Sequence, residues 1–200
     1  MREELTDIQV QEELKKRLLE SQAWLSGHFK LTSGRHSANY MQCAMLLRFP
    51  KNAAFVGGEI ARRIAPLKPD FIVSPALGGL IVGHEVARAL DVPFLFCERE
   101  DGKMRLRRFP MPVGKSFVAV EDVVTTGGSV RETADYMVQG GCRWVGSACI
   151  VDRSGGSQKL GPDLVSLFKV TFETYDPENC PLCRELGTPP VKPGSRPDGK

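Results

Sequence analysis

The sequence lacks the long apolar runs and the charge bias that indicate binding to a membrane or to nucleic acid. No apolar run approaches the ~18 residues of a membrane span, and charged residues close to Met1 interrupt any leader-like segment. Lysine and arginine total 27 against 24 aspartates and glutamates, which is too balanced for nucleic-acid binding through bulk charge. We therefore expect a cytoplasmic protein that binds neither a membrane nor nucleic acid.

Disulfide and metal patterns are also scarce. The six cysteines show no disulfide framework. Only Cys180 and Cys183 have the spacing of half a zinc site, and the sequence offers no second Cys-x-x-Cys and no paired histidines. We interpret these two cysteines mainly as reduced thiols or a packing feature, with a metal or redox role as the alternative.

What is present is an alternation of helix-like and strand-like segments. Continuous apolar runs of strand length are separated by amphipathic stretches, with short connections between them. This pattern predicts an α/β fold, a mainly parallel twisted sheet flanked by helices. The predicted helices are 6–20, 52–65, 79–90 and 129–139, and the predicted strands are 71–74, 93–98, 117–121 and 144–152.

Two hundred residues suit one ordinary domain. We expect that domain at 1–176, with an N-terminal helix and hood at 1–50 and an α/β core at 51–176. The turn-like Glu100-Asp101-Gly102 predicts that residues 99–109 form a projecting, flexible hairpin loop. Residues 177–200 are rich in proline, which predicts a tail without regular structure.

The most informative stretch runs from Phe117 to Ser129. It is an apolar strand that ends in Glu121 and Asp122 and continues into a Thr/Gly/Ser loop before a helix. Ligands bind at the carboxyl ends of strands in such sheets, and backbone N–H groups at a helix start can hold a phosphate. Carboxylates would repel that phosphate, so we expect them to accept hydrogen bonds from ribose hydroxyls. The alternative is an ordinary loop after a strand.

The run Val-Glu-Asp-Val-Val-Thr-Thr-Gly-Gly-Ser at 120–129 resembles the phosphoribosyl pyrophosphate signature of type I phosphoribosyltransferases. The dinucleotide and Walker A phosphate loops are excluded, because neither G-x-G-x-x-G after a strand nor G-x-x-x-x-G-K-[ST] occurs. Further segments are similar to the orotate phosphoribosyltransferases: 29–37, 74–79, 151–154, and the tail segments 180–183 and 191–196.

The resemblance implies Mg²⁺-dependent transfer of ribose 5-phosphate from phosphoribosyl pyrophosphate to orotate, giving orotidine 5-monophosphate and pyrophosphate in UMP biosynthesis. Such a transferase needs no nucleophilic side chain, because orotate is itself anionic and the reaction depends on alignment, leaving-group stabilisation and water exclusion. Two alternatives stay open, a purine phosphoribosyltransferase and a non-catalytic regulator that senses phosphoribosyl pyrophosphate.

The resemblance also implies roles for individual residues. Orotate would contact Thr125 and Arg153, whereas without the resemblance Arg153 could equally pair with Asp152 or Asp163 at the surface. The catalytic residues would be Lys103, Arg99 and Asp122. The residues implied for phosphoribosyl pyrophosphate are Glu121, Asp122, Val123, Val124, Thr125, Thr126, Gly127, Gly128, Ser129, Ala76, Leu77, Gly78, Gly79, Arg99 and Lys103.

Magnesium and a second subunit complete the implied site. Mg²⁺ would bind mainly through substrate oxygens and water, with Asp122 as the one candidate for a direct protein ligand. The basic hairpin at 99–109 would close over the neighbouring site of a homodimer and neutralise the departing pyrophosphate. A solvated charged surface is the alternative for this basic run.

Overall fold

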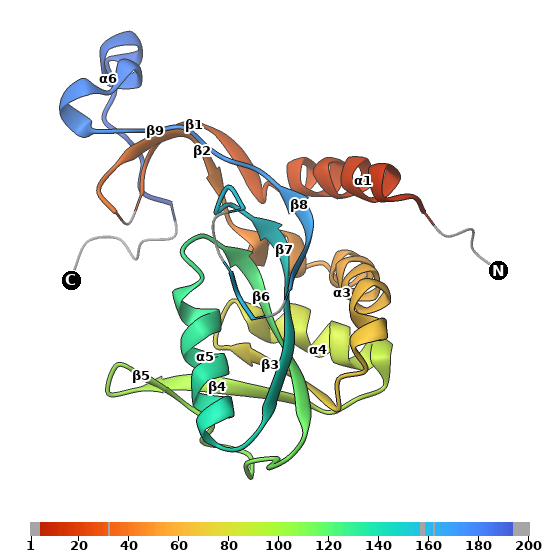
Figure 1. The fold of residues 1–200 in the computed structure, drawn as a ribbon. Helices are drawn as coiled ribbons and strands as arrows, with labels where there is room; N and C mark the ends of the chain where they lie inside the picture. The colour runs from red at the N-terminus through yellow and green to blue at the C-terminus, as the bar shows by residue number, and fades with distance from the viewer. Residues whose placement is uncertain (1–4, 32, 157–158, 162, 194–200) are drawn as a thin grey trace.

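The computed structural model describes residues 5–31, 33–156, 159–161 and 163–193. Two sheets organise the chain (Figure 1). The larger has six strands in the order β5-β4-β3-β6-β7-β8, with parallel pairing throughout except for the antiparallel β4–β5 pair. Its strands are β3 (Phe71–Pro75), β4 (Phe94–Glu100), β5 (Lys103–Arg105), β6 (Ser116–Val124), β7 (Arg143–Asp152) and β8 (Leu164–Lys169).

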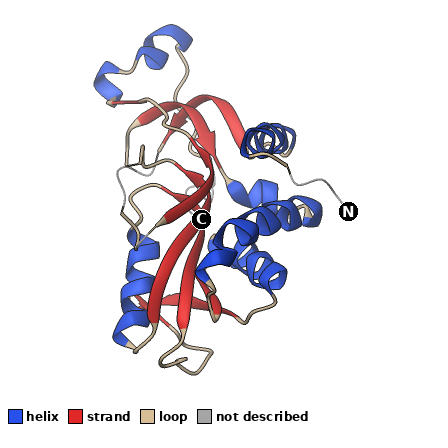
Figure 2. Ribbon diagram, turned by 45° about the vertical axis from the view of Figure 1, so that its right-hand side comes forward, coloured by secondary structure: helices blue, strands red, loops and turns tan. Residues whose placement is uncertain are grey.

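Helices cover both faces of this sheet (Figure 2). Because strand residues alternate between faces, neighbours in β3 enter different cores: Ile72 packs with the α3 and α4 side, and Phe71 and Val73 pack with the α5 side. The α/β prediction is confirmed. The helices are α1 (Asp7–Glu20), α2 (Cys43–Leu47), α3 (Pro50–Ile64), α4 (Gly79–Leu90) and α5 (Gly128–Gln139), with a 3₁₀ turn η1 (Ala65–Leu67).

The strand order reverses direction at β3. From β3 the chain passes through α4 to β4 on one side, and then β6 returns to pair with β3 on its other side. The segments that follow β3 and β6 therefore diverge at one edge of the sheet. Such a switch point leaves a crevice outside the carboxyl ends of the two strands, where ligands bind in open α/β sheets.

One strand is longer than predicted. β6 continues to Val124, so Glu121 and Asp122 lie inside the strand rather than at its end. The extension is held by parallel pairing with β7, in which Glu121 lies opposite Cys149 and Val124 opposite Asp152. The strand was predicted to end early because its two carboxyl side chains interrupt the apolar run. The backbone hydrogen bonds between the strands do not depend on the side chain, so the pairing continues.

The hood contains a second sheet that the sequence pattern did not predict. Strands β1 (Trp24–Lys30), β2 (His36–Met41) and β9 (Thr174–Tyr175) pair antiparallel in the order β1-β2-β9. Its burial does not follow a simple alternation, because β1 carries an irregularity between Ser26 and Phe29. The period of two that identifies a half-buried strand is therefore weak here.

The expectation of a tail without regular structure is wrong for the part that the structure describes. The tail forms a 3₁₀ turn η2 (Pro177–Asn179), a short helix α6 (Pro181–Leu186) and a parallel bridge between Val191 and Phe29. Prolines start both helical turns, a position where the missing N–H has no intrahelical partner to lose. Residues 194–196 of the tail motif lie outside the described residues.

The predicted hairpin is present, with β5 returning antiparallel along the end of β4. It packs closely on its own chain, because Met104 and Leu106 are buried and the Met104 N–H donates to Glu132 of α5 at 2.9 Å. Its flexibility stays a prediction. No described helix is long and apolar enough to cross a membrane.

The close approach of α3 and α4 makes neighbouring glycines respond oppositely to substitution. A Cβ at Gly57 would lie 2.5 Å from Glu85 Cβ and 2.9 Å from its carbonyl carbon, whereas one at Gly58 would meet nothing within 4 Å. We expect Gly57→Ala to lower the free energy of unfolding by roughly 1–3 kcal/mol. Gly58→Ala should raise it by about 1 kcal/mol, because alanine favours the helix. Urea denaturation of both variants measures this, and equal changes would contradict the packing.

Candidate active site

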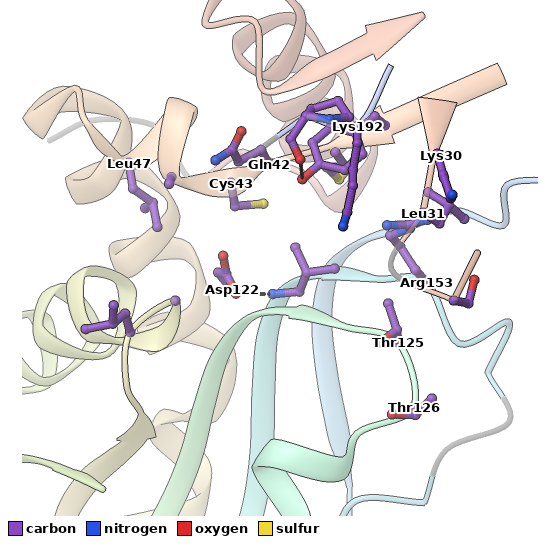
Figure 3. Close-up of a pocket in the computed structure, with 18 of the residues that line it drawn as sticks. Lys30, Leu31, Gln42, Cys43, Leu47, Asp122, Thr125, Thr126, Arg153 and Lys192 are labelled. Atoms are coloured by element: carbon purple, nitrogen blue, oxygen red, sulfur yellow. Dashed lines mark hydrogen bonds between the residues drawn. The ribbon is translucent and has the colours of Figure 1, made fainter. Parts of the chain in front are cut away.

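A pocket of about 960 Å³ lies between the switch point and the hood. Figure 3 shows that its walls come from segments far apart in the sequence, with Asp122, Thr125 and Arg153 on the core side and Lys30 and Lys192 on the hood side. Its lining residues include Lys30, Tyr40, Cys43, Leu77, Gly78, Asp122, Val123, Thr125, Thr126, Arg153 and Lys192.

Two carboxyl groups at the end of β6 form the acidic part of the site. Asp122 lines the pocket, while Glu121 is buried and lines a smaller hollow of about 70 Å³ beside it. Burial and the neighbouring Asp122 raise the pKa of Glu121 to about 9. Burial also raises the pKa of Asp122. A ligand that donates hydrogen bonds or carries positive charge would therefore be favoured here.

The smaller hollow is formed by the loop between β6 and α5. Its lining residues form one continuous stretch of chain, Val123 to Val130, together with Glu121. Gly127 has a φ of 70° and no room for a side chain, because a Cβ would lie 2.7 Å from Leu160. The N-terminus of α5 has no side-chain cap, which leaves its first N–H groups available to an anion. The geometry of this loop suits a phosphate.

The loop after β3 lies against the acidic pair. A Cβ at Gly78 would be 2.7 Å from Asp122 Oδ1, and one at Gly79 would be 2.8 Å from the Val120 carbonyl oxygen. Leu77 and Gly78 line the pocket, while Ala76 and Gly79 are not among its lining residues. The glycine pair thus lets the loop backbone approach the carboxyl groups. A side chain at either position would prevent this approach.

Arg153 follows β7 and lies across the pocket from the hood (Figure 3). Its N–H donates to the Val124 carbonyl at 2.8 Å, and its guanidinium stacks on the Phe172 ring at 4.7 Å. Its buried Nε has no hydrogen-bond partner, and burial lowers the pKa of Arg153. Among the described residues no salt bridge joins Arg153 to Asp152 or Asp163. A half-buried guanidinium with an unsatisfied Nε, beside a pocket, suits an anionic ligand.

The lining residues that reasoning from the sequence missed include three with polar groups, Lys30, Tyr40 and Lys192. Lys30 and Lys192 bring positive charge from β1 and from the tail, and Tyr40 donates its hydroxyl to the Pro193 carbonyl at 3.3 Å. Lys30 and Lys192 both lie in segments that are similar to the family, and this similarity could have identified them as site residues. Their meeting at one pocket depends on the β1–tail pairing, which no local pattern encodes.

A pocket cysteine, Cys43, does not supply a nucleophile. Burial and then the charge of Asp122 raise the pKa of its thiol well above the usual range. The thiolate that a nucleophilic cysteine requires is therefore not formed near neutral pH. This agrees with a reaction that needs no covalent side-chain intermediate.

The basic hairpin does not reach the pocket of its own chain. Arg99 forms a 2.9 Å ion pair with Glu132 and donates to the Gly102 carbonyl at 2.7 Å, and Lys103 lies in a groove between β5 and α5. Neither residue lines the main pocket. Neither predicted cation thus joins Asp122 and Arg153 in the main pocket of its own chain, although Lys103 shares its groove with Gly128 of the predicted phosphate loop.

Comparison with known proteins decides the family. The phosphoribosyl transferase domain model matches residues 48–176. Orotate phosphoribosyltransferase of Desulforamulus reducens is 46% identical over 196 residues, covering 98% of this chain and 97% of the relative. The chain belongs to the orotate phosphoribosyltransferase family.

Two further comparisons support this family assignment. Orotate phosphoribosyltransferase of Carboxydothermus hydrogenoformans is 48% identical over 187 residues, covering 92% of this chain and 97% of the relative. The crystal structure of orotate phosphoribosyltransferase from Aeropyrum pernix matches with a TM-score of 0.68 and 26% identity, covering 87% of this chain and 98% of that one. The predicted family and fold are both confirmed.

The buried acid pair gives a pH-dependent stability that can be measured. The folded protein keeps the Glu121 proton up to about pH 9, whereas the unfolded chain releases it near 4.5. Folding therefore binds a proton in this window, so this contribution to stability is present at low pH and is lost as the pH rises. Relative to Glu121→Gln, the wild type should become less stable between these two pH values. Denaturation at a series of pH values without magnesium tests this, and a constant difference would contradict it.

Proposed function

We propose that this chain catalyses the Mg²⁺-dependent transfer of ribose 5-phosphate from phosphoribosyl pyrophosphate to orotate, as a step of UMP synthesis in the cytoplasm. Family membership supports the reaction. The single structural observation that carries the site assignment is the unsatisfied Nε of Arg153, which lines the same pocket as Asp122 and Thr125. An anionic base held there would lie beside a sugar held at the end of β6.

In this proposal the loop at 125–129 holds the 5-phosphate. Its backbone N–H groups and the uncapped start of α5 provide donors and positive potential without a lysine. Thr125 and Thr126, which line both pockets, add hydroxyl donors. The phosphate would anchor the sugar so that its ring extends along β6 toward Asp122.

The acidic pair would position the ribose. Asp122, on the pocket wall, accepts hydrogen bonds from the ribose hydroxyls, and Glu121 supports it from the buried side. The loop at 76–79 offers backbone groups to the pyrophosphate, since its glycines let it approach the carboxylates. Holding the sugar at both ends leaves the anomeric carbon facing the base, and this alignment is the main catalytic effect.

Arg153 would orient the base. Its planar guanidinium can make two parallel hydrogen bonds to the carboxylate of orotate. Thr125, on the same wall of the pocket, would contact the base edge. A purine carries no such carboxylate, so this arginine is also the feature that favours orotate over the purine alternative.

The donor chemistry fits magnesium. The site offers carboxyl oxygens at Asp122 and Glu121, and hard divalent cations prefer oxygen ligands while keeping several waters. Asp122 is the only one of the two on the main pocket. Magnesium bound with the substrate would neutralise the charge of the pyrophosphate leaving group.

We also propose a homodimer in which the hairpin at 99–109 acts on the partner's site. Arg99 and Lys103 do not line the pocket of their own chain, so their catalytic role requires a second subunit. There they would stabilise negative charge on pyrophosphate and exclude water. Breaking the 2.9 Å ion pair between Arg99 and Glu132 would be part of releasing the hairpin.

The first test is the loss of orotate absorbance with purified protein, phosphoribosyl pyrophosphate and Mg²⁺. We expect turnover that requires magnesium and collapses in both Asp122→Asn and Lys103→Ala. An absence of orotate turnover together with retained sugar-pyrophosphate binding would overturn the orotate assignment. Assays with purine bases would then separate a purine phosphoribosyltransferase from a non-catalytic regulator.

The role of Arg153, which follows β7, is tested by comparing its substitution with that of an arginine at the other end of the strand. Removing one partner of a charged, hydrogen-bonded pair costs roughly 2–5 kcal/mol, so Arg153→Met should lower kcat/KM for orotate by about 30-fold or more. The dissociation constant of phosphoribosyl pyrophosphate should change little. Arg143→Met, an exposed position at the opposite end of β7, is the matched control and should keep wild-type kinetics.

Mixing two inactive variants tests the dimeric site. If the hairpin acts across the interface, Lys103→Ala and Arg153→Met subunits that exchange freely form heterodimers with one intact site. The mixture should recover about one quarter of wild-type activity, since half of the dimers are then heterodimers with half of their sites complete. An unchanged, inactive mixture of exchanging subunits would contradict action across the interface.

A further inference from the structure

Four potential metal ligands meet outside the proposed active site. His28 of β1 and His36 of β2 lie beside Cys180 and Cys183 at the start of α6. One ligand atom from each residue lies within 4.8 Å of all the others. Three of the side chains are buried and Cys183 is half-buried. The paired histidines that the sequence did not reveal are thus supplied by the hairpin between β1 and β2.

Four of the six distances between the ligand atoms are close to those of a tetrahedral zinc site, and the other two are within 4.8 Å. Typical zinc bonds are about 2.3 Å to sulfur and about 2.0–2.1 Å to nitrogen, so tetrahedral ligands are separated by about 3.3 Å for two nitrogens and about 3.6 Å for nitrogen and sulfur. His28 Nε2 and His36 Nδ1 are 3.1 Å apart. The nitrogen–sulfur separations are 3.7 Å and 3.6 Å from His28 Nε2 to Cys180 and Cys183, and 3.3 Å from His36 Nδ1 to Cys183.

We propose that His28 Nε2, His36 Nδ1, Cys180 Sγ and Cys183 Sγ bind one zinc ion. Two thiolates and two imidazoles form a donor set that favours zinc over magnesium or calcium, which require oxygen ligands. Four protein ligands complete a tetrahedron and leave no open position for a water or a substrate. The site is therefore structural rather than catalytic.

A second contact orients His28 for this role. Its Nδ1 lies 3.2 Å from the Thr188 carbonyl oxygen. A carbonyl only accepts hydrogen bonds, so Nδ1 carries the proton and Nε2 presents a lone pair to the cluster. Histidines that bind metals are commonly held in this way by a backbone carbonyl.

Hydrogen bonds alone satisfy this cluster poorly. With the proton of His28 on Nδ1, its Nε2 can only accept, yet it faces His36 Nδ1 and both sulfur atoms at once. Thiols are weak donors. A single cation at the centre instead satisfies all four atoms, which explains why they converge.

The proposed zinc would fasten the tail onto the hood. Close to the cluster, the Val191 N–H donates to the His28 carbonyl and the Lys30 N–H donates to the Val191 carbonyl, both at 2.8 Å. Two lysines at this pairing of β1 with the tail, Lys30 and Lys192, line the active-site pocket. Zinc would thus organise the hood side of the pocket without contacting substrate.

Metal content of the purified full-length protein tests the proposal. After expression with added zinc, we expect about one zinc per chain by elemental analysis. Cobalt substituted for zinc should give the intense visible bands of tetrahedral Co(II) and a thiolate-to-cobalt charge-transfer band. Protein without bound zinc that also gives no such cobalt spectrum would overturn the proposal, as would a Cys180–Cys183 disulfide in freshly prepared protein.

Substitutions separate the four ligands from other histidines and cysteines. Cys180→Ser/Cys183→Ser and His36→Gln should lower the zinc content about tenfold or more and lower the Tm. His84→Gln, at an exposed histidine outside the cluster, should keep both values, and Cys142→Ser, at a buried cysteine outside the cluster, should keep the zinc content. If the ligand variants unfold, cobalt titration of zinc-stripped wild-type protein replaces them, and octahedral spectra without thiolate bands would contradict the site. A zinc content unchanged in folded ligand variants would also refute it.

Discussion

The parallel pairing of β3 with β6 is the constraint on which the rest of the structure depends. It makes the chain leave two adjacent strands in divergent directions, so the glycine loop after β3 and the loop at 125–129 after β6 open around one crevice. The pairing also fixes which β6 residues face that crevice. A shift by one residue would exchange Asp122 on the pocket wall with its buried neighbour and move every apolar side chain to the wrong core.

Around this crevice the protein holds polar groups that its own fold does not fully satisfy. Glu121 is buried with a raised pKa, Asp122 lies beside it, and the Nε of Arg153 has no partner. Each arrangement costs stability in the unliganded protein. The surrounding strands and helices supply enough apolar burial to tolerate that cost, and the result is a site already arranged for a ligand with an anionic end and hydroxyl groups.

The parts that could be predicted from sequence are those whose signals are local. The α/β core, the capped first helix and the β6–loop–α5 segment follow from apolar periodicity, the Thr6–Gln9 capping box and a phosphate-loop motif. The hood sheet, the helix in the tail and the His28–Cys183 cluster depend on pairing between distant segments. Such pairing leaves little trace in short windows, because it is decided by tertiary contacts. In the proposed homodimer, the positions of Arg99 and Lys103 relative to a site would likewise depend on a second subunit.

The hood joins the beginning of the described chain to its end, and this has a consequence for synthesis. Ser37 of β2 donates to the carbonyl of Glu173, 136 residues later, and β1 gains its bridge only from Val191. During synthesis the β1–β2 hairpin therefore emerges first, and its later pairing partners are synthesised only after the whole α/β core. Contacts of such long sequence separation form slowly. The active-site pocket is thus among the last features of the nascent protein to be completed, after the core that carries its phosphate loop has already folded.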